Sequence, residues 1–246
     1  MKVLEPLKAV TLKEEFITRF EELILSGVFP VGRWLPPERE LAKTLKVSRP
    51  VVHEGLLDLA SKGLITLYPR RGTKVNDYRK DGSLELLVSL SRYTGGSLEP
   101  GLLAGILEMR LLFEKETARL AALNRTEEDT VLLEELLEEE KRFESMSASE
   151  IALLDYRFHH QVALSGGNLI YPLLMNSLKP LYLGILEKFY LRREVLPGIT
   201  VFHQEIVMAV ILKSAGKAAE AMEKMLIYSQ EELGKLYGSG DRTSSG

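Results

Sequence analysis

The stretch LPPERELAKTLKVSRP, residues 35–50, contains the signals that determine the fold of the first part of the chain. Two prolines precede Glu38, and proline is tolerated at a helix start because its missing N–H would have no intrahelical partner there. Acidic side chains in the first turn suit the positive end of the helix dipole. Ser48 is a good N-cap for a further helix, in whose first turn Pro50 does little harm. The stretch therefore predicts two helices joined by a tight turn at Lys46.

The sequence on either side completes a small domain. Apolar residues recur at helical spacing over residues 12–25, and Gly27 marks the end of that helix. Downstream, two short β-type runs at residues 64–68 and 73–75 enclose a basic turn, which predicts a hairpin. Three helices followed by a hairpin are the layout of a winged helix-turn-helix domain, which we assign to residues 1–78.

The rest of the chain has the pattern of helices. Helical periodicity, punctuated in most places by Gly, Asn or Pro, is found in residues 84–93, 99–124, 127–144, 149–165, 168–193, 198–214 and 217–237. No convincing strand interrupts them. The predicted fold class is therefore mainly α, with the winged domain followed by an all-α helical bundle in residues 83–237. The small, polar residues 238–246 are expected to form a disordered tail.

Composition and charge narrow the function classes. The 246 residues include no cysteine, which excludes a disulfide scaffold, a thiolate zinc finger and a cysteine nucleophile. Because we find neither a run of about 20 apolar residues nor an apolar N-terminal signal, we expect a cytoplasmic protein without a membrane partner. Residues 1–80 have 15 Lys and Arg against 10 Asp and Glu, whereas residues 81–246 have 17 against 25. A basic first third suits a phosphate backbone as partner.

The helix after the tight turn carries side chains suited to reading DNA. In a helix-turn-helix this second helix enters the major groove, where arginine matches the paired acceptors of guanine. Arg49 and His53 are one turn apart on its exposed side, so we expect both to reach base edges. Other residues are expected to hold phosphates, and the hairpin tip to enter the minor groove. The predicted DNA-binding residues are Arg39, Ser48, Arg49, His53, Arg70, Arg71 and Gly72.

These motifs resemble the DNA-binding domain of GntR-type bacterial transcription regulators. The resemblance covers about residues 10–76 and rests on residues 35–42, 47–49, 63–65 and 71–75. It implies operator contacts at Arg39, Ser48, Arg49, His53 and the Arg71-Gly72 tip. The chain departs from the family pattern at His53, where an Arg is usual, and at Pro50, where a small hydroxyl residue is common.

A second set of polar residues falls in the predicted bundle. Asp155 and His159 are four residues apart and project from one helical face, and the bundle could bring His203 opposite them. One carboxylate and two imidazoles suit Zn²⁺, Ni²⁺ or Fe²⁺ and leave positions open for water or a ligand carboxylate. The alternative is an Asp–His pair that is satisfied inside the bundle. The glutamate-rich run at residues 134–140 is expected to be a solvated helix face.

The helical part is similar to the effector domain of the FadR subgroup of the same family. The similarity covers about residues 83–237 and rests on residues 109–114, 121–122, 155–159, 165–168, His203 and 216–221. It implies a metal held by one Asp and three His, and Tyr228 occupies the position expected for the third His. Fatty-acid-responsive members of the subgroup, which have a Tyr at that position, are also similar and bind long-chain acyl-CoA without a metal.

Three residues are predicted to contact the effector. Arg110 is suited to anchor an anion, although an ion pair with Glu114, four residues later, is the commoner fate of such an arginine. Asn168 lies in one of the motifs that carry the similarity, and Tyr228 replaces the expected ligand. The effector is thus expected to be a small carboxylic acid, with acyl-CoA as the alternative.

The combination predicts a transcription regulator controlled by a small acidic metabolite. Proteins with a two-fold axis match palindromic operators, so we expect a homodimer on DNA. The competing class is a metal-dependent hydrolase that uses Asp155, His159 and His203. It is disfavoured because no spaced acid–base pair stands out among the helices.

Overall fold

The computed structural model describes residues 11–93 and 100–238, with side chains described as far as residue 90 in the first range and residue 236 in the second. The chain divides into two compact units, Met1–Ser97 and Leu98–Gly246. Residues 239–246, which belong to the predicted disordered tail, lie outside the described residues.

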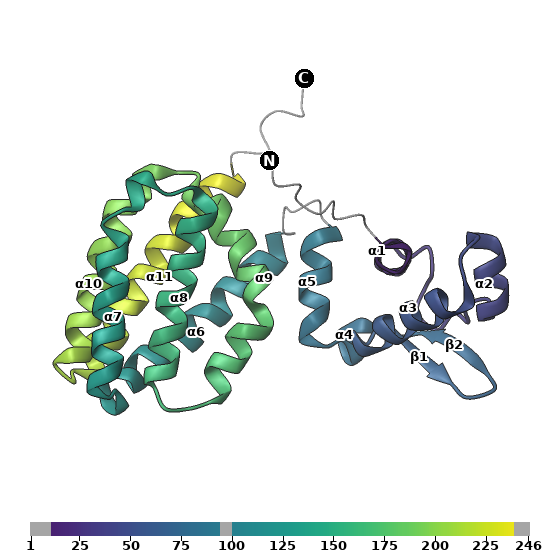
Figure 1. The fold of residues 1–246 in the computed structure, drawn as a ribbon, viewed down its shortest axis with the longest axis horizontal. Helices are drawn as coiled ribbons and strands as arrows, with labels where there is room; N and C mark the ends of the chain where they lie inside the picture. The colour runs from purple at the N-terminus through teal and green to yellow at the C-terminus, as the bar shows by residue number, and fades with distance from the viewer. Residues whose placement is uncertain (1–10, 94–99, 239–246) are drawn as a thin grey trace, which may run out of the picture. The chain divides into compact units, whose positions relative to one another are not determined.

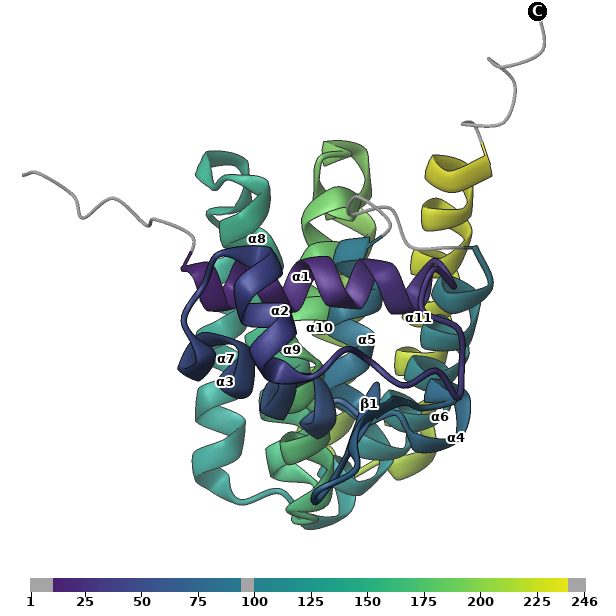
Figure 2. The same ribbon diagram turned by 90° about the vertical axis from the view of Figure 1, so that its right-hand side faces the viewer.

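The first unit contains the predicted winged helix-turn-helix. Its elements are α1 (Leu12–Leu25), α2 (Glu38–Leu45), α3 (Arg49–Ser61), β1 (Ile65–Tyr68), β2 (Gly72–Val75), α4 (Tyr78–Asp81) and α5 (Leu84–Tyr93). The two strands pair antiparallel, with Ile65 opposite Val75. An isolated bridge between Trp34 and Lys74 adds a third extended segment to the hairpin. Helix α3 packs against both α1 and α2, and Figure 2 shows α2 and α3 next to each other.

The turns of this unit form where the sequence signals predict. Ser48 is the N-cap of α3, and its hydroxyl accepts a hydrogen bond from the Val51 N–H at 3.5 Å. Lys46, between α2 and α3, adopts a left-handed φ of 56°. Gly63 follows α3 with a φ of +76°, and a Cβ there would lie 1.9 Å from the Asp81 carbonyl oxygen. Only glycine fits this position without a backbone shift.

Helix α5 packs on the first unit, although the sequence assigned residues 84–93 to the helical module. Leu86 is 3% exposed and belongs to the same core cluster as Phe20 and Leu56. The Ser89 hydroxyl donates to Glu21 Oε1 at 2.7 Å, and both side chains are buried. The apolar period of a helix predicts that one face is covered but does not say which module covers it.

The second unit is a helical bundle, as predicted, and its described residues include no strand. Its elements are α6 (Pro100–Asn124), α7 (Glu127–Glu140), η1 (Phe143–Ser145), α8 (Ala148–Ser165), α9 (Ile170–Tyr190), η2 (Arg193–Val195), α10 (Leu196–Ile211) and α11 (Ala215–Gly238). Helix α6 packs against α8, α10 and α11 (Figure 1). Its alanines Ala118, Ala121 and Ala122 are fully buried, and such small side chains let helices approach closely.

One stretch of this bundle, Arg193–Ile211, is long and apolar enough to cross a membrane by length and composition alone, and 44% of it is buried. The stretch contains α10, which packs against α6, α7 and α11. Its buried residues Ile206, Val207 and Val210 belong to the core of the bundle. A core helix has the same composition as a membrane span, so the stretch is weak support for one.

Candidate functional site

The exposed N-terminal part of α3 carries the residues predicted to read bases. Arg49 is the first residue of the helix, and His53 lies one turn later. Both are exposed, whereas Val52 and Leu56 of the same helix are buried in the core. Arg39, in the first turn of α2, is also exposed. The fold therefore leaves these predicted DNA contacts free to meet a duplex.

The hairpin tip is exposed and tightly turned. Arg70 has a left-handed φ of 62°, and Gly72 has a φ of 107°. The Arg71 N–H donates to the Tyr68 carbonyl at 3.0 Å and closes the turn. Arg70, Arg71 and Gly72 are all exposed, so the basic side chains project from a backbone of fixed shape.

Sequence analysis missed Trp34 beside this hairpin. Trp34 is 46% exposed, and its ring lies 5.4 Å from the Tyr68 ring, centroid to centroid. Lys74 Nζ lies 6.0 Å from the centre of the Trp34 ring. The aromatic pair supports the hairpin from one side. As the only tryptophan of the chain, next to Arg33, Trp34 could have been singled out.

His53 has a partner that the sequence did not predict. Its Nδ1 atom lies 2.9 Å from Oε1 of Glu38, the first residue of α2. The side chains are 54% and 32% exposed. The pair joins the two helices of the helix-turn-helix at its outer surface.

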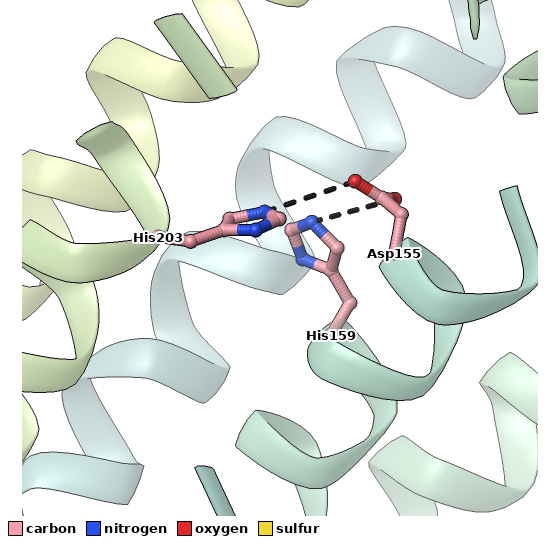
Figure 3. A group of neighbouring side chains, drawn as sticks. All are labelled: Asp155, His159 and His203. Atoms are coloured by element: carbon pink, nitrogen blue, oxygen red, sulfur yellow. Dashed lines mark ion pairs between the residues drawn. The ribbon is translucent and has the colours of Figure 1, made fainter. Parts of the chain in front are cut away.

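Within the bundle, α8 and α10 bring together the three predicted metal ligands. One ligand atom from each of Asp155, His159 and His203 lies within 4.8 Å of the others, and all three side chains are buried (Figure 3). His159 Nε2 lies 3.8 Å from Asp155 Oδ2, and His203 Nε2 lies 3.7 Å from Asp155 Oδ1. The structure thus brings together the three residues that the sequence singled out as candidate metal ligands.

The three atoms that face one another have no hydrogen-bond partner. Asp155 Oδ2, His159 Nε2 and His203 Nε2 are all shielded from solvent and unpartnered. A buried polar group without a partner costs about 1–3 kcal/mol. Two imidazole nitrogens and a carboxylate oxygen are a donor set that Zn²⁺ and similar ions accept. The cluster thus fits a divalent transition metal.

A second set of groups fixes the orientation of these side chains. Glu140 Oε1 lies 2.6 Å from His203 Nδ1, and Glu114 Oε2 lies 2.9 Å from His159 Nδ1. The Tyr190 hydroxyl donates to Asp155 Oδ1 at 2.5 Å. Carboxylates on Nδ1 direct Nε2 toward the centre of the cluster, as in metal sites whose histidines are held by carboxylates.

The charge of the cluster depends on its two histidines, because it holds three carboxylates and one guanidinium. Burial by itself lowers the pKa of His203, but the Glu140 and Asp155 carboxylates raise it above its ordinary value. With neutral imidazoles, Arg110 balances only one of the three carboxylates, which are those of Glu114, Glu140 and Asp155. In that state the two excess negative charges favour a divalent cation, whereas protonation of both imidazoles would balance them without one.

Arg110, predicted as an anchor for the effector, is part of this network. Its side chain is 3% exposed and contacts Glu114 with Nε at 2.6 Å and Nη2 at 3.2 Å. Burial by itself raises the pKa of Glu114, but Arg110 and His159 lower it well below its ordinary value. The i to i+4 ion pair, which the sequence offered as the alternative, is therefore what forms.

The other two predicted effector residues lie elsewhere in the bundle. Asn168 is exposed, and its Oδ1 accepts the Ile170 N–H at 3.1 Å at the start of α9. The centre of the Tyr228 ring lies 5.7 Å from that of the Phe202 ring. A Cβ atom placed on Gly198 would lie 3.2 Å from the Tyr228 side chain. Among the described residues, neither the Asn168 hydrogen bond nor the Tyr228 ring contact involves the histidine cluster. Their effector roles remain predictions from the resemblance.

Glu140 corrects the interpretation of the glutamate-rich run as a solvated face. Glu140 is 2% exposed, and its Oε1 atom lies 2.6 Å from His203 Nδ1. Glu138 and Glu139 pair instead with surface Lys and Arg residues. The signal was available, because Glu140 follows the buried Leu133 and Leu136 at helical spacing. A glutamate on the apolar face of a helix needs a buried partner.

Two family profiles together match nearly all the described residues. The family described as "Bacterial regulatory proteins, gntR family" matches residues 12–75. The family described as "FadR C-terminal domain" matches residues 76–237. The second match includes α5, which in the structure packs on the first unit.

Individual proteins agree with these matches. The chain is 34% identical over 169 residues to the fatty acid metabolism regulator protein of Proteus mirabilis, covering 69% of this chain and 67% of that protein. It is 32% identical over 179 residues to the HTH-type transcriptional regulator Mce2R of Mycobacterium tuberculosis, 73% of each. A solved structure of Streptococcus agalactiae GntR matches with a TM-score of 0.50 and 26% identity, covering 89% of this chain and 100% of that one.

The fold, the exposed recognition helix and these matches describe a regulator and not an enzyme. The chain belongs to the GntR family of bacterial transcription regulators and carries a C-terminal domain of the FadR type.

Proposed function

We propose that this regulator holds a divalent metal ion in its helical unit and is controlled by a carboxylic acid that binds there. The observation that carries the proposal is the set of facing, unpartnered atoms on Asp155, His159 and His203. Such an ion would supply open positions for a carboxylate ligand. Glu114 and Glu140 lie on the Nδ1 side of the two imidazoles, so that each Nε2 is directed toward the centre of the cluster.

Metal analysis tests this proposal. Purified wild-type protein should contain about one equivalent of Zn, Ni or Fe, and His159→Ala or His203→Ala should lose it. His160→Ala is the matched control, because His160 lines a separate groove with Asn176 and Lys179. A wild-type protein without metal after metal-replete expression, or equal loss in the control, contradicts the proposal.

The second candidate effector is an acyl-CoA bound without metal. It is supported by relatives whose names identify them as fatty acid metabolism regulators, at 34% and 31% identity. Mass spectrometry of the purified protein distinguishes the two: a retained acyl-CoA with no stoichiometric metal favours this candidate. Operator-binding titrations with acyl-CoA and with short carboxylic acids then identify which ligand changes the affinity.

On DNA, we propose that a cytoplasmic homodimer places one α3 helix in each half-site. Arg49 and His53 contact base edges, Arg39 and Ser48 contact phosphates, and the hairpin tip enters the minor groove with Arg70, Arg71 and Gly72. This arrangement is supported by the exposure of all these residues on one winged unit. A two-fold dimer suits half-sites about one helical turn apart. An effector that binds two dimer geometries unequally then changes operator affinity.

A further inference from the structure

The contact between His53 and Glu38 restricts which hydrogen bonds His53 can make with a base. Histidine Nδ1 lies 2.9 Å from a carboxylate oxygen. An ionised carboxylate only accepts hydrogen bonds, so the imidazole must carry its proton on Nδ1. In the neutral ring the other nitrogen, Nε2, is then an acceptor with a free lone pair.

His53 is placed where this distinction has consequences. It lies on the exposed side of α3, one turn after Arg49, and more than half of its side chain is exposed. In the major groove, adenine N6 and cytosine N4 are donors, whereas guanine offers only acceptors at N7 and O6. An acceptor nitrogen can therefore bond only to the amino group of adenine or cytosine, while a donor at the same place can bond to the acceptors of guanine, thymine or adenine.

We propose that Glu38 is a positioning residue for sequence recognition: it holds the His53 tautomer that accepts a hydrogen bond from an adenine or cytosine amino group. The base pair concerned neighbours the one read by Arg49. The inference rests on the proposed contact of His53 with a base edge. It also gives a physical consequence to the His that stands where arginine, a donor, is usual.

The pair has little to do with folding. Both side chains are partly exposed, and exposed ion pairs contribute little to stability. Glu38→Gln should consequently leave the unfolding midpoint of the winged unit unchanged. Glu40→Gln is the matched control, because it removes the same charge from the first turn of the same helix.

Selection from a pool of randomised operator half-sites tests the proposal, with wild type, E38Q, H53A, R49A and E40Q compared at one salt concentration. Wild type should prefer adenine or cytosine at one base pair by about fivefold or more. E38Q and H53A should reduce that preference to below about twofold and leave the other positions unchanged. E40Q should keep the wild-type preference.

Two results overturn the role of Glu38: a wild-type preference for guanine or thymine at the position sensitive to H53A, or a base preference in E38Q that matches that of E40Q. If H53A changes no position while R49A does, the His53 contact and this inference both fail, and the proposed Arg49 contact stands. If R49A also changes nothing, the proposed DNA contacts of α3 fail as a whole.

Discussion

Glu114 holds three groups at once: the Arg110 guanidinium, the His159 ring and the Tyr182 hydroxyl, which donates to Oε1 at 2.6 Å. All of these side chains are buried. A charge taken out of water is stable only when its partners remain, so this carboxylate links the packing of α6 to that of α8 and α9. The histidine cluster depends on it for orientation as well.

Replacing Glu114 by Gln should destabilise the second unit by roughly 3–5 kcal/mol at pH 7, because Arg110 is left buried without its partner. The folded-state pKa of Glu114 is lowered from 4.5. Its stabilisation is therefore complete above pH 4.5 and is lost as the pH falls through the lower folded-state value. Urea unfolding in the presence of a chelator should show that the difference in the free energy of unfolding between wild type and Glu114→Gln becomes smaller below pH 4.5.

Glu116→Gln on the same helix is the control. Glu116 pairs with Arg119 at the surface, so its loss should change the free energy of unfolding by less than about 1 kcal/mol. Equal losses for the two variants, or a gap that widens in acid, would contradict the role given to Glu114.

At the scale of elements, Gly63 at the end of α3 allows the chain before α5 to approach closely. Gly63 joins α3 to β1 and also lies against the chain at Asp81, just before α5. Sequence analysis placed Gly63 in a motif that carries the resemblance to GntR-type regulators. It did not predict the close approach of Asp81, because a contact 18 residues away leaves no local pattern.

Gly63→Ala and Gly27→Ala separate the cost of backbone strain at positive φ from the cost of the close approach of Asp81. Both positions have positive φ, +76° and +79°, but a Cβ at Gly27 meets nothing within 4 Å. Gly27→Ala should cost about 1–2 kcal/mol from backbone strain alone. Gly63→Ala should cost upwards of about 3 kcal/mol, because the chain at Asp81 must also move. Thermal unfolding of both variants checks this, and similar midpoints would show that the close approach is not maintained in solution.

At the scale of the whole molecule, sequence patterns predicted the two-module order and the metal-type cluster but not the network around it. Asp155 and His159 share a helix, so their spacing alone placed them together. Glu140 and Tyr190 reach the cluster from other helices, and their positions depend on packing that has no signature in the sequence. Tyr228 was assigned by resemblance, and the structure places its ring beside Phe202.

The proposed homodimer makes a prediction for salt dependence. The logarithm of operator affinity falls with the logarithm of salt concentration, by about 0.9 for each phosphate contact. Arg39→Ala removes one contact from each subunit, so the magnitude of the slope should fall by about 1.8 for a dimer. Arg49→Ala should instead weaken binding mainly to the cognate sequence, by about 1–3 kcal/mol for each half-site.

Fluorescence anisotropy over a range of salt concentrations, with cognate and scrambled duplexes, measures both effects. A slope change near 0.9 for Arg39→Ala would indicate a single bound subunit. A uniform loss on both duplexes for Arg49→Ala would reassign that residue to the backbone.

The cluster takes its donors from α8 and α10, and the whole of α9 lies between them in the chain. A metal ion bound by both Asp155 and His203 would link α8 to α10 and so close a loop of the chain that contains α9. Closing such a loop lowers the entropy of any partly opened state. Helix α9 could then leave the bundle only with both of its ends held in place. Protection of its backbone amides from hydrogen exchange would therefore show whether an ion links α8 to α10.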